Sequence, residues 1–195
     1  MSLRAFLISL LLLSIPFLGK AQQRFEGKLI GGFVLAQIDG DRLAGYNKIG
    51  LQGGLGVKTI LNERWSLGLE FLYTQQGSSR TLNDPSGAAF EKIRLNLVEA
   101  PVLLYFADWK FEVGAGISYG RVINFEAIDV FGEDVSNTQD FRENIFSFNA
   151  DLLFNFSEQL ALGIRWSKYL NNLQADPASG TFLGKQIAIR GLFKL

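Results

Sequence analysis

Apolar and polar residues alternate along most of the chain after residue 24, in segments of about ten residues. In the clearest segment, Trp65–Thr74, every second residue from Trp65 onward is a large apolar or aromatic residue. Segments 145–156, 160–167 and 186–195 alternate in the same way. A period of two places these apolar residues on one face of a β-strand. Alternation over about ten residues is typical of strands in membrane barrels.

Four further segments fit this pattern less regularly: Phe25–Ala36, Ile49–Ile60, Ile93–Phe106 and Phe111–Tyr119. The third is almost entirely apolar and contains Pro101. A proline within a strand predicts a bulge or a local break in the hydrogen-bond ladder. The facing of this third segment is therefore the least defined by its pattern.

The connections between these segments alternate between short and long. The joins at 61–64, 107–108 and 157–158 are short, whereas those at 37–48, 75–92, 120–144 and 171–182 are long and polar. Outer-membrane barrels have short periplasmic turns and long extracellular loops. The sequence therefore predicts an all-β fold, an eight-stranded antiparallel transmembrane up-and-down β-barrel with both ends at the periplasmic rim. A soluble β-sandwich or lipocalin-like barrel is the alternative.

Residues 1–21 have the features of a secretory signal peptide. Arg4 precedes the apolar stretch Ala5–Leu18, and the small residues Gly19 and Ala21 precede a predicted cleavage site before Gln22. The apolar stretch is shorter than the roughly 20 residues of a spanning helix, which argues against the alternative of an N-terminal membrane anchor. We expect residues 22–195 to form the barrel domain, located in the bacterial outer membrane.

The composition narrows the chemistry available to the chain. Lys plus Arg and Asp plus Glu both number 19, so no basic surplus indicates a nucleic-acid partner. The chain has no Cys and no His. It therefore lacks disulfides, thiolate chemistry, the commonest general base and the commonest transition-metal ligand. We expect no cofactor.

The charged residues of the strands fall mainly on the face opposite the apolar one. This inward set consists of five acidic and five basic residues: Glu26, Lys28, Lys58, Glu70, Glu99, Glu112, Asp151, Arg165, Arg190 and Lys194. Buried charges are costly unless they are paired. We therefore expect an interior charge network that fills the lumen as a structural plug, the alternative being a selective polar pathway.

Aromatic residues with polar groups are predicted near the strand ends, where they would form interfacial girdles. They are Trp65, Tyr73, Tyr105, Trp109, Tyr119, Trp166 and Tyr169. The alternative is that they are ordinary strand aromatics.

The third long loop is acidic, with no basic residue between Val122 and Phe141. It carries the candidate recognition residues Glu126, Asp129, Glu133, Asp134 and Asp140. Loops on a rigid scaffold often determine specificity. A plain solvated loop or weak divalent-cation binding are the alternatives, and we predict no defined metal site because no EF-hand spacing is present.

Two features resemble catalytic motifs. Gly116–Gly120 matches the G-x-S-x-G nucleophile pattern, but the strand alternation continues through Ser118 and no histidine is available. Glu70, Glu99 and Glu112 could divide acid and base roles if they were neighbours. Ion pairing explains these carboxylates more simply, and we predict no catalytic residues.

The chain resembles the PorT-like family of outer-membrane β-barrel proteins. The resemblance rests on Gly31–Phe33 with Gln37–Asp41, on Gly45–Lys48, and on Leu97–Tyr105, which is similar to an L-x-E-x-P-L-L-L-K-Y segment without its Lys. The C-terminal Phe193–Leu195 is similar to an assembly signal, although Leu replaces the usual final aromatic residue. The resemblance implies an outer-membrane barrel and, through one family member, a link to protein secretion.

These observations predict a non-enzymatic barrel with a structural or interaction role through its extracellular loops. A narrow porin-like solute channel and an accessory factor of a protein secretion machine are the alternatives. We expect a monomeric barrel in contact with outer-membrane lipid, with an envelope or extracellular protein as its partner and no nucleic acid.

Overall fold

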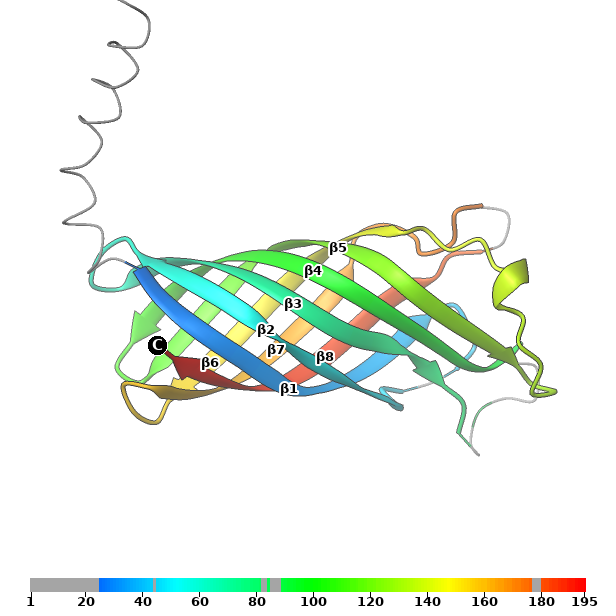
Figure 1. The fold of residues 1–195 in the computed structure, drawn as a ribbon, viewed down its shortest axis with the longest axis horizontal. Helices are drawn as coiled ribbons and strands as arrows, with labels where there is room; N and C mark the ends of the chain where they lie inside the picture. Colours follow the sequence, from blue (N-terminus) through cyan, green and yellow to red (C-terminus); the bar gives the residue numbers. More distant parts are fainter. Residues whose placement is uncertain (1–24, 44, 82–83, 85–88, 177–179) are drawn as a thin grey trace, which may run out of the picture.

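A computed structural model of the chain describes residues 25–43, 45–81, 84, 89–176 and 180–195. The predicted signal peptide lies outside these residues. Within them, eight strands and one short 3-10 helix follow one another (Figure 1). They are β1 Phe25–Asp39, β2 Lys48–Ile60, β3 Trp65–Ser79, β4 Phe90–Asp108, β5 Phe111–Asp129, η1 Ser136–Thr138, β6 Asn144–Asn155, β7 Leu160–Tyr169 and β8 Leu183–Lys194.

Each strand pairs antiparallel with the next, and β1 also pairs with β8, so the sheet closes into a barrel. Closure gives every strand two hydrogen-bonded neighbours, which a sheet surrounded by hydrocarbon requires. The predicted eight-stranded antiparallel barrel is confirmed. No helix in the described part of the chain is long and apolar enough to cross a membrane.

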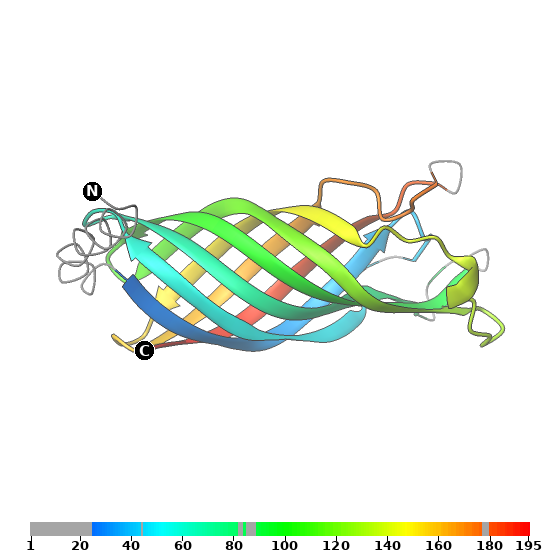
Figure 2. The same cartoon turned by 45° about the horizontal axis from the view of Figure 1, so that its top comes forward.

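The two ends of the barrel differ (Figures 1 and 2). At the turn end, where the chain terminates, residues 61–64, 109–110 and 156–159 make short connections. At the loop end, residues 40–47, 80–89, 130–143 and 170–182 make long ones. This alternation is the predicted one.

The outer face of the barrel is apolar over most of its height. Outward residues of different strands are largely exposed in the isolated molecule, including Phe33 at 62%, Leu55 at 59%, Phe71 at 64% and Ile117 at 62%. Their neighbours on the inner face, such as Glu70 and Ser118, are buried. An apolar exterior around a polar interior is the arrangement of a barrel that faces lipid.

The polarity of the two faces reverses towards the loop end. On β4, Ile93, Leu95 and Leu97 point inward and are fully buried, whereas the outward Arg94 lies in an ion pair with Glu126 of β5. A cluster of buried apolar residues fills the barrel here: Ile38, Phe90, Ile93, Leu95, Leu97, Val122, Ala127, Phe141, Ile145, Tyr169, Leu173 and Phe182. We call this cluster the apolar crown. This part of the barrel has the polarity of a water-soluble protein and marks where the lipid-facing band ends.

The strands extend further at the loop end than predicted. β5 continues to Asp129, so the expected loop 120–144 is reduced to 130–143, and β3 and β4 extend into the expected loop 75–92. The alternation that identified these strands depends on lipid outside and polar groups inside. Beyond the lipid band that pattern reverses, and bulges between β4 and β5 at 90–92 and 96–97 disturb it further.

Pro101 lies within β4 and interrupts its pairing with β3. The ladder pairs Leu69 with Val102 and resumes with Leu72 opposite Glu99, in the same register. The strand remains paired with β5, where Ser118 is opposite Pro101. The local break predicted for this proline is confirmed.

Two adjacent glycines of β1 lie on opposite faces of the sheet. They allow a test of how closely the inner face of the barrel is packed. A Cβ on Gly32 would lie 2.1 Å from the backbone oxygen of Ile189, whereas one on Gly31 would meet nothing within 4 Å. We expect Gly32→Ala to destabilise the barrel by about 1–3 kcal/mol through overpacking. Gly31→Ala should stabilise it by roughly 0.5–1 kcal/mol. Urea unfolding of the refolded variants measures both, and equal effects would contradict the assigned facing.

Candidate functional site

Five charged side chains from five strands meet in the middle of the lumen. Arg165 and Arg190 each bind both Glu70 Oε2, at 2.8 and 3.0 Å, and Asp151 Oδ2, at 2.8 and 2.5 Å. Lys28 Nζ binds Glu70 Oε1 at 2.7 Å. The side chains of Glu70, Asp151, Arg165 and Arg190 are at most 1% exposed. We call these five residues the central cluster, in which each carboxylate lies between two guanidinium groups.

Tyr105 lies inside the barrel next to the central cluster and not in an interfacial girdle. Its side chain is fully buried, and its hydroxyl donates to Asp151 Oδ2 at 2.7 Å. Tyr169 is also buried inside the barrel, where its hydroxyl donates to Gln76 Oε1 at 2.6 Å. The girdle prediction is therefore wrong for both tyrosines. Five of the predicted girdle residues do point outward: Trp65, Tyr73, Trp109, Tyr119 and Trp166.

A second group of charges lies nearer the turn end. Lys58 Nζ contacts Glu112 Oε1 at 3.1 Å and Glu26 Oε1 at 3.4 Å. Lys194 Nζ is 4.0 Å from Glu26 Oε1, and Asn155 donates to Glu112 Oε1 at 3.1 Å. These side chains are more exposed than the central cluster, with 25% for Glu26. The two acidic and two basic side chains of this group are balanced in charge and partly exposed.

Glu99 is the member of the inward set that joins neither group. Its Oε1 accepts a hydrogen bond from Gln76 Nε2 at 3.4 Å, and no cation contacts it within the described residues. Glu70 and Glu112 are held by different cations, so the three carboxylates share no contact that would pair them for acid–base chemistry. Ser118 of the G-x-S-x-G match is buried within β5, on a strand and not on a strand-to-helix turn.

The lumen is filled along its length. The second group of charges lies in the part of the lumen nearest the turn end, and the central cluster lies in its middle. Above them, polar side chains bond to one another, with Gln52 donating to Thr74 at 3.0 Å and Ser167 to Asn149 at 2.7 Å. The apolar crown then closes the loop end. The side chains inside the barrel therefore change from charged to polar to apolar between the turn end and the loop end.

The predicted acidic residues of the loop end are dispersed. Glu126 lies on β5, between Lys92 and Arg94 at 3.2 and 3.6 Å, and Asp129 ends the same strand. These two residues are therefore not loop residues as predicted. In the part of the chain that the structure describes, no group of three or more acidic side chains is arranged to hold a metal ion. Glu133 and Asp140 lie in 130–143, apart from the paired Glu126.

Two aspartates of the loop end stabilise their own turns. Asp129 Oδ1 accepts from the backbone N–H groups of Phe131 and Glu133 at 2.8 and 2.9 Å. Asp134 accepts from the hydroxyl and the N–H of Ser136, and these hydrogen bonds lower the pKa of its carboxyl. Both carboxylates thus stabilise the conformation of the segment 130–143 through hydrogen bonds to its own residues.

The other acidic pair of the loop end is also divided. Asp39 binds Lys185 at 2.9 Å on the outer face. Asp41 is buried and accepts hydrogen bonds from Ser78 and from the N–H of Leu43 at 2.9 Å. Burial raises the pKa of the Asp41 carboxyl, against these hydrogen bonds.

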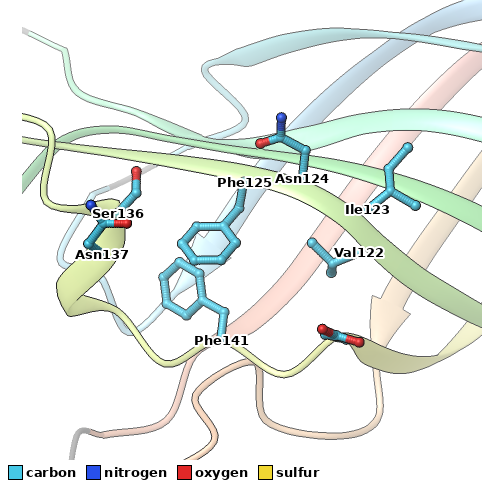
Figure 3. Close-up of a pocket in the computed structure, with 8 residues that line it drawn as sticks. Val122, Ile123, Asn124, Phe125, Ser136, Asn137 and Phe141 are labelled. Atoms are coloured by element: carbon cyan, nitrogen blue, oxygen red, sulfur yellow. The ribbon is translucent and has the colours of Figure 1, made fainter.

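A pocket of about 330 Å³ opens where the segment 130–143 returns along β5 (Figure 3). Its lining consists of Val122, Ile123, Asn124, Phe125, Ser136, Asn137, Phe141 and Glu143. The rings of Phe125 and Phe141 pack against one another at an interplanar angle of 58°, with centroids 5.1 Å apart. The volume lies in the range of small-molecule sites. The sequence pattern did not indicate this pocket, because it forms where strand and loop diverge.

The family comparison agrees with this architecture. The model of the outer membrane protein beta-barrel domain family matches residues 5–183. The chain therefore belongs to this family of bacterial outer-membrane barrels. The match does not test the narrower PorT-like resemblance or the cleavage of a signal peptide, and both stay predictions.

Solved structures of other outer-membrane proteins are similar in fold but distant in sequence. The attachment invasion locus protein Ail of Yersinia pestis is 12% identical with a TM-score of 0.53, over 88% of this chain and 99% of that one. Ail in complex with the heparin analogue sucrose octasulfate gives 11% identity and a TM-score of 0.50, over 88% and 99%. Neisserial surface protein A is 14% identical with a TM-score of 0.48, over 88% and 97%. No curated protein matches the chain in sequence.

Proposed function

We infer that this protein is a non-conducting, non-enzymatic outer-membrane barrel that interacts with an envelope or extracellular partner through its loop end. The filled lumen carries this proposal. The central cluster crosses the barrel at its middle, and the apolar crown seals it above. A barrel whose interior is occupied by its own side chains offers its ends for function, and among the described residues the longer connections lie at the loop end.

The charge arrangement supports a structural role for the interior. In the central cluster, the guanidinium groups of Arg165 and Arg190 each form ion pairs with both carboxylates, those of Glu70 and Asp151. All four side chains are buried. A pathway for ions needs charged groups that can exchange partners with the passing solute. The porin-like alternative therefore has no support in the described lumen. The role in secretion implied by the PorT-like resemblance stays a prediction without a site.

Planar-bilayer recording tests the sealed lumen directly. We expect the refolded mature chain to insert without stepwise conductance, because neither the central cluster nor the apolar crown leaves an aqueous path. An outer-membrane porin reconstituted under the same conditions serves as the positive control for insertion and conductance, and heat-modifiable mobility verifies that the inserted chain is folded. Discrete channels from the unaltered chain would contradict the proposal.

Complementation tests the role of the loop end. Residues 130–140 are replaced by a short Gly-Asn linker, which leaves the lipid-facing parts of β5 and β6 unchanged. In cells lacking the protein, we expect this trimmed barrel to reach the outer membrane and shift on unboiled gels, yet fail to restore the phenotype. Replacement of the turn residues 62–63 is the matched control. Full complementation by the trimmed barrel would contradict an interaction role for this segment.

A further inference from the structure

Two lysines lie directly opposite each other on the outer face of the barrel, towards its loop end. In the antiparallel pairing of β7 with β8, Lys168 is the partner of Lys185. Opposite residues of an antiparallel pair project from the same face of the sheet, and like charges in such a pair repel. We call these two residues the lysine pair. Its arrangement is unfavourable unless an anion lies close to both ammonium groups.

The protein itself supplies a carboxylate to one member of the lysine pair. Lys185 Nζ binds Asp39 Oδ1 of β1 at 2.9 Å and lies 5.9 Å from the ring centroid of Tyr46, in the connection that follows β1. These contacts draw the Lys185 side chain away from β7. Lys168 is exposed, and among the described residues no carboxylate forms an ion pair with it. The site therefore carries one net positive charge.

The outer wall next to the lysine pair is apolar in the direction of the barrel's middle. The next two outward pairs of the same strands are Trp166 opposite Ile187 and Ile164 opposite Ile189. Phe148 of β6 widens this wall, with its ring centroid 6.4 Å from that of Trp166. A positive charge at one end of a continuous apolar surface is complementary to an amphiphile with an anionic head.

We propose that the lysine pair binds the phosphate group of a lipid in the leaflet around the loop end. The phosphate lies between the two ammonium groups and accepts hydrogen bonds from both, which are charge-assisted and therefore strong. The acyl chains lie along the apolar wall of β7 and β8. The phosphate relieves the repulsion between the lysines. This inference goes beyond the proposed function, because it concerns the wall of the barrel and not the partner of its loops.

A lipid phosphate fits this place better than a phosphate dissolved in water. Lys168 emerges between the outward side chains of Trp166 and Leu170, which are 36% and 62% exposed in the isolated molecule. A dissolved anion loses hydration when it enters such apolar surroundings, whereas acyl chains hold a lipid phosphate at the membrane surface. The outward Arg121 of β5 differs from Lys168, because Glu143 neutralises it at 2.7 Å.

The test uses the refolded mature chain in detergent, titrated with phosphatidic acid as the probe and with phosphatidylcholine as the control lipid. Native mass spectrometry counts the bound lipids. We expect phosphatidic acid to bind at least ~10-fold more tightly than phosphatidylcholine, since hydrogen bonds to charged groups are worth about 1.5–3 kcal/mol. Inorganic phosphate in excess should not displace it.

Variants locate the binding. Lys168→Met keeps the length of the side chain and removes its charge, so we expect it to lower the affinity for phosphatidic acid to that for phosphatidylcholine. Lys185→Met should weaken binding as well, whereas Lys168→Arg should retain it. Lys110→Met is the matched control, because it removes an exposed lysine at the turn end. Heat-modifiable mobility verifies that each variant is folded.

Stability in vesicles of phosphatidylcholine alone separates a lipid-binding role from a structural one. There, Lys168→Met should fold at least as well as the unaltered chain, because it removes a like-charge pair and places an apolar group on the lipid face. A loss of stability would mean that Lys168 holds the fold together and would overturn the proposal.

Equal affinity for both lipids, or unchanged binding by Lys168→Met, would also overturn it. Displacement by inorganic phosphate would replace the lipid with a soluble anion. These failures are distinct from failure of the proposed function. The trimmed barrel without residues 130–140 keeps β7 and β8, so it should bind phosphatidic acid whether or not it complements.

Discussion

Glu70→Gln is expected to destabilise the barrel by about 3–5 kcal/mol, the range found when one partner of a buried ion pair is removed. The carboxylate of Glu70 forms ion pairs with Lys28, Arg165 and Arg190, and its side chain is inaccessible to solvent. The substitution keeps the volume and removes the charge, so Lys28 loses its ion pair with Glu70, and Arg165 and Arg190 keep their ion pairs with Asp151 alone. Denaturant unfolding of the refolded variant, followed by tryptophan fluorescence and heat-modifiable mobility, measures the loss.

Glu26→Gln is the matched control for this prediction. Glu26 contacts Lys58 and Lys194 at 3.4 and 4.0 Å, and its side chain is 25% exposed at the turn end. Water screens this pair, so we expect a loss below about 1 kcal/mol. If both substitutions cost the same, the central cluster has no special role in holding the strands together.

The central cluster shows what the sequence can and cannot predict about a barrel interior. Alternation along single strands identifies Lys28, Glu70 and Arg190 as inward residues. Their partnership depends on the register of strands that are far apart in the chain, with 120 positions between Glu70 and Arg190. A balanced count of charges therefore predicts that pairs form, but only the closed sheet determines which ones.

The two misassigned tyrosines had a usable signal. Tyr105 has the same parity on β4 as Glu99, and Tyr169 has the same parity on β7 as Arg165, so alternation alone turns both inward. Their position near strand ends favoured a girdle instead. Tyr105 lies three residues before the end of β4 and Tyr169 is the last residue of β7, so nearness to a strand end does not decide the facing of a side chain, whereas its parity does.

The loop end was harder to predict for a physical reason. Inward Leu95 and outward Arg94 obey the rule for soluble proteins, whereas Glu70 and Phe71 obey the rule for lipid. When one pattern of alternation is applied to the whole chain, the predicted strands therefore end at the boundary between lipid and water, although the real strands continue beyond it. The extension of β5, and the pocket that it lines, follow from a tertiary contact with 130–143 that has no local sequence signature.

The height of the lipid band leads to the second large effect. Leu69 lies on the outward face of β3 and is 48% exposed in the isolated molecule. We expect Leu69→Arg to cost about 2–4 kcal/mol in a bilayer, because a charge on the lipid face near the midplane loses its hydration. Folding titrations in lipid vesicles, with the folded fraction read on unboiled gels, measure this cost.

Gln75→Arg provides the comparison on the same face of the same strand. Gln75 lies beyond the outward Tyr73, whose hydroxyl bonds to Asn96 of β4 at 3.1 Å, and this polar contact marks the edge of the apolar band. The cost there should be about 0–1 kcal/mol, as for charges near the interface. Equal costs at the two positions would mean that lipid covers the wall to the height of Gln75. The reversal of polarity would then have to begin nearer the loop end, and the apolar crown would lie within the bilayer.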